Sequence, residues 1–269
     1  MTTVNSLKDW LCCNKRKPCD YSNFSVIDLK EAADYSTETK EYLKKIFYNQ
    51  IIGLKLLSDL AEELGWENVK NTFISPSIPT EGRAIKKGDF GEILFTAILE
   101  EIHGYKTPFY KIYHKIIAEQ SLPRTDILCL KLDDNNSINE VCFVESKLRI
   151  VHDDYAAKKG VKQIYDEYDT DLPDILRFTM KMLDYQQSEL RNPFIKYLAS
   201  RNHNQNLDNF RLSLCWESDQ WNEVPLKILE AEELKLANLT VHVIRIDGLE
   251  TIIKEVFSEF DVEGLLDDE

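Results

Sequence analysis

The sequence has no long hydrophobic run. None of its apolar stretches approaches the roughly 20 residues that a membrane-spanning helix needs, and its opening, Met-Thr-Thr-Val-Asn-Ser-Leu-Lys, shows no cleavable signal pattern. We therefore expect a cytoplasmic protein with no membrane partner.

The sequence also has no excess of positive charge. Its 33 Lys and Arg residues face 47 Asp and Glu residues, which gives a net charge of −14. This balance argues against a protein that binds nucleic acid through bulk electrostatics. The acidic excess is C-terminal: residues 1–82 carry 10 basic and 12 acidic side chains, residues 83–162 carry 13 and 12, and residues 163–269 carry 10 and 23. The middle stretch is therefore close to neutral.

Cysteines are too few to indicate a disulfide scaffold in a chain of this length, since there are six in 269 residues. Cys129, Cys142 and Cys215 lie in strand-like runs and are expected to be reduced core residues. The close group of Cys12, Cys13 and Cys19 fits no common zinc finger and has no histidine beside it, so we predict no zinc site there.

With 43% hydrophobic residues, the chain can bury a large core. We expect an N-terminal, mainly helical region at 1–82 and an α/β domain at 83–269. The first region should hold a helix capped by Ser36 or Thr37 and ending near Gly65, because its apolar residues recur at three-to-four spacing. The Pro- and Ser-rich stretch 73–82 is predicted to be the loop at the boundary.

Periodicity in the rest of the chain alternates between helix and strand. The expected strands are 23–29, 107–117, 210–216 and 239–246, and the expected helices are 88–103, 155–167, 173–199 with a kink near Pro193, 224–236 and 249–260. This order predicts an α/β fold with a mixed β-sheet flanked by helices.

The segment from Arg124 to Arg149 contains two apolar runs around the polar sequence Asp-Asp-Asn-Asn-Ser, which is typical of a β-hairpin. In the second run, the side-chain period of two puts Glu145 and Lys147 on one face. Charged side chains are rarely buried unless they are paired or bind a metal. Glu145 and Lys147, together with Asp126 on the neighbouring strand, therefore predict a cation site.

Glu92 has two interpretations. It follows Asp89 by three residues at the expected start of a helix, which is the spacing of a capping box, and in that role its carboxylate would only close the helix end. Alternatively, it faces the same cation site. Spacing alone does not separate the two.

The hairpin resembles the PD-(D/E)xK nuclease motif. Thr-Asp-Ile-Leu is followed 19 residues later by Glu-Ser-Lys, so the resemblance implies that Asp126 and Glu145 bind metal and that Lys147 is the motif lysine. It also implies a restriction-endonuclease-like fold and gives Glu92 the place of an additional acidic site residue. Arg124-Thr125 stands where the nominal proline would precede the aspartate.

Four short motifs further resemble the nuclease subunit of the Hachiman anti-phage defence system. They are Gly-Asp-Phe-Gly-Glu-Ile-Leu, Pro-Arg-Thr-Asp-Ile-Leu, Phe-Val-Glu-Ser-Lys and Val-His-Val-Ile-Arg-Ile, and the resemblance covers roughly residues 80–250. It implies a DNA-cleaving effector that is controlled by a helicase-like ATPase partner.

The residue types suit this chemistry. Asp126, Glu145 and the backbone carbonyl of Ser146 offer the hard oxygen ligands that Mg²⁺ or Mn²⁺ prefers, and Lys147 can stabilise the charge that develops on the phosphate. No pattern indicates base-specific readout. Two alternatives remain: a catalytically inactive docking or regulatory subunit of the same fold, and a restriction-type or RNA-cleaving nuclease.

Overall fold

The computed structural model describes residues 6–16, 21–79, 83–115, 117–119, 125–201 and 207–258. The strands are β1 Leu11–Lys15, β2 Ser25–Glu31, β3 Ile127–Leu132, β4 Ile138–Arg149, β5 Asp208–Glu217 and β6 Leu239–Ile246. The helices are α1 Leu7–Trp10, α2 Thr37–Ile51, α3 Leu54–Leu64, α4 Trp66–Val69, α5 Ser75–Ser77, α6 Arg83–Glu101, α7 Ala156–Tyr185, α8 Arg191–Arg201, α9 Val224–Glu230 and α10 Leu249–Val256.

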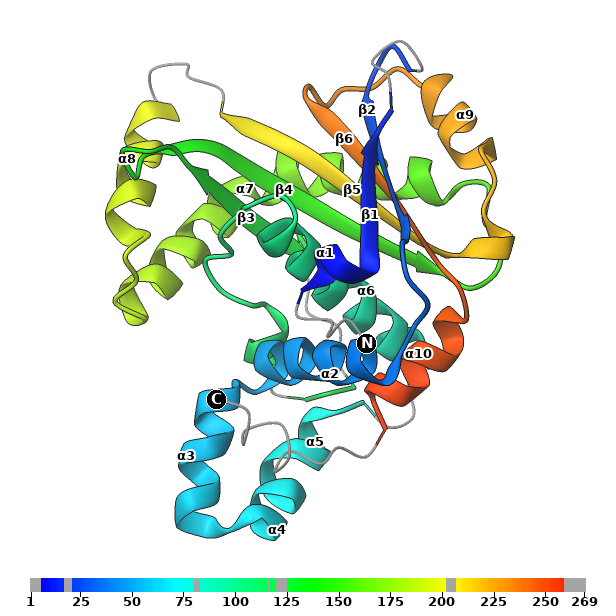
Figure 1. Ribbon diagram of the computed structural model, residues 1–269. Helices are drawn as coiled ribbons and strands as arrows, with labels where there is room; N and C mark the ends of the chain where they lie inside the picture. The colour runs from blue at the N-terminus through cyan, green and yellow to red at the C-terminus, as the bar shows by residue number, and fades with distance from the viewer. Residues whose placement is uncertain are drawn as a thin grey trace.

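All six strands form one mixed sheet in the order β1-β2-β6-β5-β4-β3 (Figure 1). The four inner strands are parallel, while β1 and β3 run antiparallel at the two edges. The predicted α/β class with a mixed sheet flanked by helices is confirmed.

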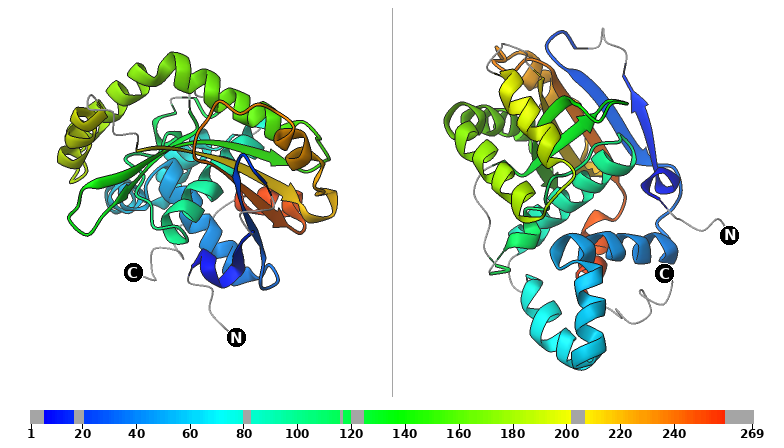
Figure 2. Two further views of the ribbon diagram at one scale, coloured as in Figure 1. Left: turned by 90° about the horizontal axis from the view of Figure 1, so that it is seen from above. Right: turned by 90° about the vertical axis from the view of Figure 1, so that its left-hand side faces the viewer.

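Helices cover both faces of the sheet and make two separate cores. α1, α2, α6 and α10 pack on one face, which we call the α6 face, and α7, α8 and α9 pack on the other, the α7 face (Figure 2). Alternation along β4 divides its side chains between them: Cys142 and Val144 lie in the first core, and Val141 and Phe143 in the second. The predicted period of two in this strand is therefore confirmed.

The hairpin of β3 and β4 is closed by its own side chains. Oδ1 of Asp133 accepts hydrogen bonds from the amides of Asn135 and Ser137, at 2.9 and 2.8 Å, and Asn136 takes the left-handed conformation with φ of 56°. Asp and Asn suit both tasks. The predicted hairpin is confirmed from Ile127 to Arg149, whereas Arg124 lies outside the described residues.

The N-terminal region is mainly helical, but it also contributes β1 and β2 to the common sheet. β1 was not predicted. The expected single helix 37–65 is wrong, because Gly53 at φ of 90° ends one helix and begins the next. The stretch 73–77 was expected to be loop but is helical, because a π-helical turn, Lys70–Ile74, follows α4 and leads into α5. These turns lie with α3 away from the sheet (Figure 1). The boundary at residue 82 stays a prediction, because residues 80–82 lie outside the described ranges.

Three other expectations need correction. Residues 107–117 form no strand in their described part; a single bridge between Lys106 and Leu130 is followed by a 3-10 turn, Ile112–His114. The helices expected at 155–167 and 173–199 are instead α7 and α8, with Pro173 inside α7. That proline is tolerated within a long helix that arches over the sheet (Figure 2).

Neither α7, at 30 residues, nor any other described helix has the length and apolar character needed to cross a bilayer.

Candidate functional site

The candidate site lies where β3 ends and β4 continues. Their last pair is Ile127 with Val144, but β4 still pairs with β5 as far as Arg149. Beyond the last pair, Oδ2 of Asp126 accepts a hydrogen bond of 3.0 Å from the amide of Ser146. The N–H and C=O of one strand residue point to the same edge, so the Ser146 carbonyl faces the side on which Asp126 lies.

Glu145 and Lys147 lie together on the α7 face. Nζ of Lys147 donates hydrogen bonds to Glu145 and, over 2.7 Å, to Oε1 of Gln163 on α7. Gln163 in turn donates to Glu167, one helical turn further on, over 3.0 Å. The lysine is thus held by the strand on one side and by the helix on the other.

The Glu145 carboxyl is only 2% exposed. Burial, followed by the nearby negative charge of Asp126, raises its pKa from an ordinary 4.5 to about 8, although Lys147 opposes this rise. Its second oxygen, Oε2, is buried and has no hydrogen-bond partner within the described parts of the chain. A buried, unpartnered carboxylate oxygen is costly unless another ligand satisfies it.

Glu92 lies near Asp126, but on the other face of β4 from Glu145, because it belongs to α6. The capping interpretation is wrong: α6 already begins at Arg83, and Asp89 makes an ion pair with Lys115, with Nζ 2.6 Å from Oδ1. Burial and then the charge of Asp126 raise the pKa of Glu92 well above its ordinary value. Asp126 is therefore the carboxylate that links Glu92 to Glu145 electrostatically.

Lys111 is a member of the site that sequence reasoning did not single out. Its Nζ lies 3.7 Å from Oδ1 of Asp126 and donates a 3.4 Å hydrogen bond to the carbonyl of Thr125. Its positive charge lowers the pKa values of both Glu92 and Glu167, against the burial that raises them. No local pattern marks Lys111, whereas the four-residue spacing of Gln163 and Glu167 places both on one face of α7.

Asp126, Glu145 and the Ser146 carbonyl fit a hard divalent cation. They are oxygen donors, and the unpartnered Oε2 of Glu145 would gain a ligand. Among the residues that the structure describes, no three Asp, Glu, His or Cys side chains are grouped so as to hold a metal. Glu92 is thus not a third side chain in such a group. Cys12 and Cys13 are free thiols, and Cys19 lies outside the described residues.

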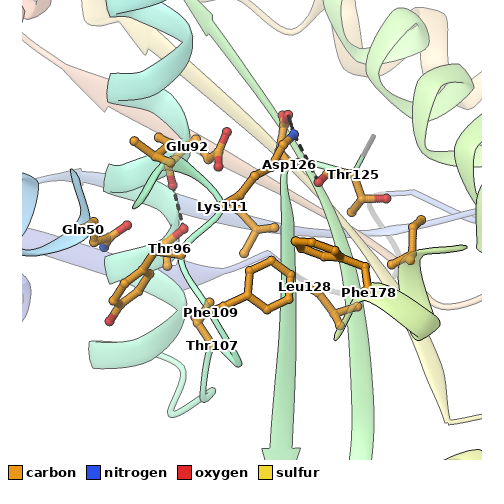
Figure 3. A pocket seen from close by; sticks show the side chains of 14 residues that line it. Gln50, Glu92, Thr96, Thr107, Phe109, Lys111, Thr125, Asp126, Leu128 and Phe178 are labelled. Carbon is orange, nitrogen blue, oxygen red and sulfur yellow. Dashed lines mark hydrogen bonds and ion pairs between the residues drawn. The ribbon is translucent and has the colours of Figure 1, made fainter. Parts of the chain in front are cut away.

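A cavity of about 280 Å³ opens beside Glu92 and Asp126 (Figure 3). Glu92, Lys111 and Asp126 form its polar side. The remaining lining residues come from α2, α6, the segment before β3, β3 itself and α7; they are Gln50, Thr96, Thr107, Phe109, Tyr110, Ile112, Thr125, Ile127, Leu128, Ile175 and Phe178.

Comparison with known proteins gives one family. The model of the HamA family matches residues 5–260, which is nearly the whole chain. No curated protein matches it. The match includes both the N-terminal region and every strand of the sheet, so it extends well beyond the hairpin motif.

Proposed function

From the premise that the chain belongs to the HamA family and is a component of Hachiman anti-phage defence, we propose that it is a metal-dependent nuclease. It hydrolyses phosphodiester bonds of DNA with little sequence specificity, uses Mg²⁺ or Mn²⁺, and works with a helicase-like ATPase (HamB-like) partner.

One observation carries the proposal: the hydrogen bond between Asp126 and the Ser146 amide. It brings the Asp126 carboxylate to the open edge of β4 at Ser146, which stands between Glu145 and Lys147 in the sequence. Two carboxylates, a strand carbonyl and an ammonium group within one short stretch of sheet are the donor set that phosphodiester hydrolysis needs.

The residues have separate tasks in this proposal. Asp126, Glu145 and the Ser146 carbonyl hold the metal, which when bound supplies Lewis-acid activation of water and of the phosphoryl oxygen. Lys147 is kept in place by Glu145 and Gln163, so its ammonium group is preorganised to stabilise negative charge on the phosphate. Glu92 and Lys111 adjust the charge around Asp126 from the other side.

The partner follows from the charge of the chain. A net charge of −14 gives little unspecific attraction for a polyanion, so DNA must be delivered. A helicase-like ATPase can both hold DNA and restrain the nuclease until foreign or damaged DNA is present, as the Hachiman resemblance implies.

The test is to incubate the purified chain, with and without its partner, with plasmid DNA and with RNA in Mg²⁺ or Mn²⁺. We expect cleavage of DNA that EDTA abolishes. Glu145→Ala and Lys147→Ala should each lower the rate by roughly 100-fold or more, while circular dichroism shows an unchanged fold.

Lys162→Ala is the matched control. Lys162 lies on α7 beside Gln163, but it pairs with Asp166 at the surface, so its loss should leave cleavage unchanged. Full activity of Lys147→Ala would remove this site from the mechanism. Cleavage of RNA in place of DNA would favour the RNA-cleaving alternative, and a chain inert in every condition would favour the docking subunit.

A further inference from the structure

Apart from Asp126, the residues that line the cavity take no part in the proposed metal site. Its volume of about 280 Å³ is close to the lower end of small-ligand pockets, about 300 Å³. Only one side of it carries charge, and most of the remaining wall is apolar or aromatic. A cavity of this kind takes a flat or apolar group whose charged attachment lies at the rim.

Two phenylalanines form its aromatic wall. Phe109, from the segment before β3, and Phe178, on α7, contact each other edge to face, with ring centroids 5.1 Å apart (Figure 3). Phe178 is 43% exposed, although it is a large apolar side chain. An exposed aromatic ring at the mouth of a cavity is available to stack on a ligand.

The wall also offers hydrogen-bonding groups. Gln50, Thr96 and Thr107 line the cavity. The Gln50 amide donates to the carbonyl of Ile93 and the Thr96 hydroxyl to that of Glu92, and each side chain keeps an acceptor oxygen. Leu130 exchanges both of its backbone hydrogen bonds with Lys106 at the outer edge of β3. By strand alternation, the N–H and C=O of Leu128 point to that same edge, beside the cavity. Hydrogen-bonding groups beside an aromatic wall suit the edge of a nucleobase.

We propose that this cavity binds one unpaired nucleobase of the DNA strand whose phosphate lies at Asp126 and Glu145. The inference rests on the proposed nuclease function and narrows its substrate to single-stranded or frayed DNA. In a duplex the bases are stacked inside the helix, so a base can enter a side cavity only after it has left the stack. Lys111 lines the cavity and lies 3.7 Å from Asp126, so it can contact the phosphate attached to that base.

The observations favour a base over an apolar side chain of a partner protein. The cavity shares Asp126 with the proposed phosphate site, so its occupant has to carry a phosphate, or at least tolerate one, close by. Stacking on aromatic rings also accepts any base, which agrees with cleavage of low sequence specificity.

The test measures binding to the full chain carrying Glu145→Gln, at low ionic strength, so that it does not depend on cleavage. Three probes of equal length are compared by fluorescence anisotropy: oligothymidylate, the same sugar–phosphate strand without bases, and a duplex. Phe178→Ala should weaken oligothymidylate binding roughly 5- to 100-fold, and should leave binding of the base-free strand unchanged. Tyr185→Ala is the control, because Tyr185 is an aromatic residue of the same helix, 84% exposed and outside the cavity.

Equal effects of Phe178→Ala on the strands with and without bases would overturn the inference, as would a duplex that binds as well as oligothymidylate. If Phe178→Ala lost binding to the helicase-like partner but kept binding to oligothymidylate, the cavity would belong to a partner side chain. That result would also overturn the inference. In each of these cases, DNA cleavage by the wild-type chain would leave the proposed function intact. The proposed function fails separately, if the wild type cleaves no DNA.

Discussion

At the scale of single residues, Asp126 is the most connected group of the site. Its carboxylate accepts from the Ser146 amide, lies near the Lys111 ammonium, and raises the pKa values of both Glu92 and Glu145. Buried carboxylates whose pKa values are raised by a neighbouring carboxylate, as those of Glu92 and Glu145 are, are a common mark of functional sites. A bound cation would reverse this repulsion.

A pH dependence of stability follows for Glu145. Its pKa is 4.5 ordinarily and about 8 in the folded chain. Between these values the folded chain binds more protons than the unfolded chain, so the free energy of unfolding falls as pH rises. Glu145→Gln cannot ionise and should gain stability relative to wild type from about pH 5 to about pH 8, on the order of 1 kcal/mol per pH unit.

Thermal unfolding in EDTA across this pH range measures the difference. Glu62→Gln, the same change at an exposed position of α3, is the control against which the pH dependence of Glu145→Gln is measured. A pH-independent difference between Glu145→Gln and wild type would contradict the expectation.

The sequence could predict that Asp126, Glu145 and Lys147 lie together, because local rules determine their positions. A hairpin turn fixes the register of the two strands, and the period of two fixes which side chains share a face. Lys111 and Gln163 reach the site only through the packing of a loop and a helix on the sheet. No local pattern joins either residue to Asp126 or Lys147, so neither could be assigned a role.

At the scale of elements, the approach of α6 to β4 controls the site. A Cβ atom on Gly91 would lie 2.9 Å from Oγ of Ser146 and 3.3 Å from Cβ of Leu148. Glycine is therefore required here for close helix–strand packing. Since Ser146 also donates to Asp126, any shift of this strand segment displaces a candidate ligand.

Gly91→Ala should destabilise the chain by roughly 1–3 kcal/mol through overpacking, and should lower cleavage through the shift at Ser146. Gly88→Ala on the same helix is the matched control. A Cβ there meets nothing within 4 Å, so alanine should stabilise the helix by about 0.5–1 kcal/mol. Urea unfolding of both variants measures these effects, and changes of the same sign would contradict the packing argument.

Elements with strong local signals were predicted well. β6 occupies the predicted 239–246, and β5 begins two residues before its predicted start, because long apolar or periodic runs determine them. α9 begins at the predicted Val224 but ends at Glu230, six residues before the expected end at 236. The five residues of β1 are too short for a clear pattern, and its pairing with β2 decides its conformation. The aromatic stretch 107–117 has strand-like composition, yet beyond the one bridge at Lys106 it curls into a turn that places Lys111 near Asp126.

At the scale of the whole molecule, charge is distributed against DNA binding. Residues 163–269 hold 23 acidic and only 10 basic side chains, and the described part of that half includes α7, α8 and α9, which cover the α7 face. An acidic surface can serve solubility alone. Under the proposed function, in which a partner delivers the DNA, it is also a suitable docking surface for a basic protein.

We expect the isolated chain to bind DNA weakly at physiological salt, and its complex with the helicase-like partner to weaken as salt is raised. Reversing exposed acids of the C-terminal half, Asp169, Asp219 and Glu233, should reduce partner affinity more than reversing Glu62 and Glu63 in the N-terminal region. The opposite order would move the docking surface to the N-terminal helices. Tight DNA binding by the chain alone, or indifference to both reversals, would contradict charge-driven delivery.

The Asp126 carboxylate has two roles. Its hydrogen bond with the Ser146 amide closes the end of the β3–β4 pair, and it is a candidate metal ligand. A substitution at position 126 separates the structural role from metal binding only if the new residue keeps an acceptor oxygen and loses the charge. Asparagine does both. A lineage that abandoned cleavage but still needed this fold for docking should therefore settle on asparagine at position 126. Alanine at that position would instead leave the Ser146 amide without its partner, so inactivity would then come with a loosened sheet edge.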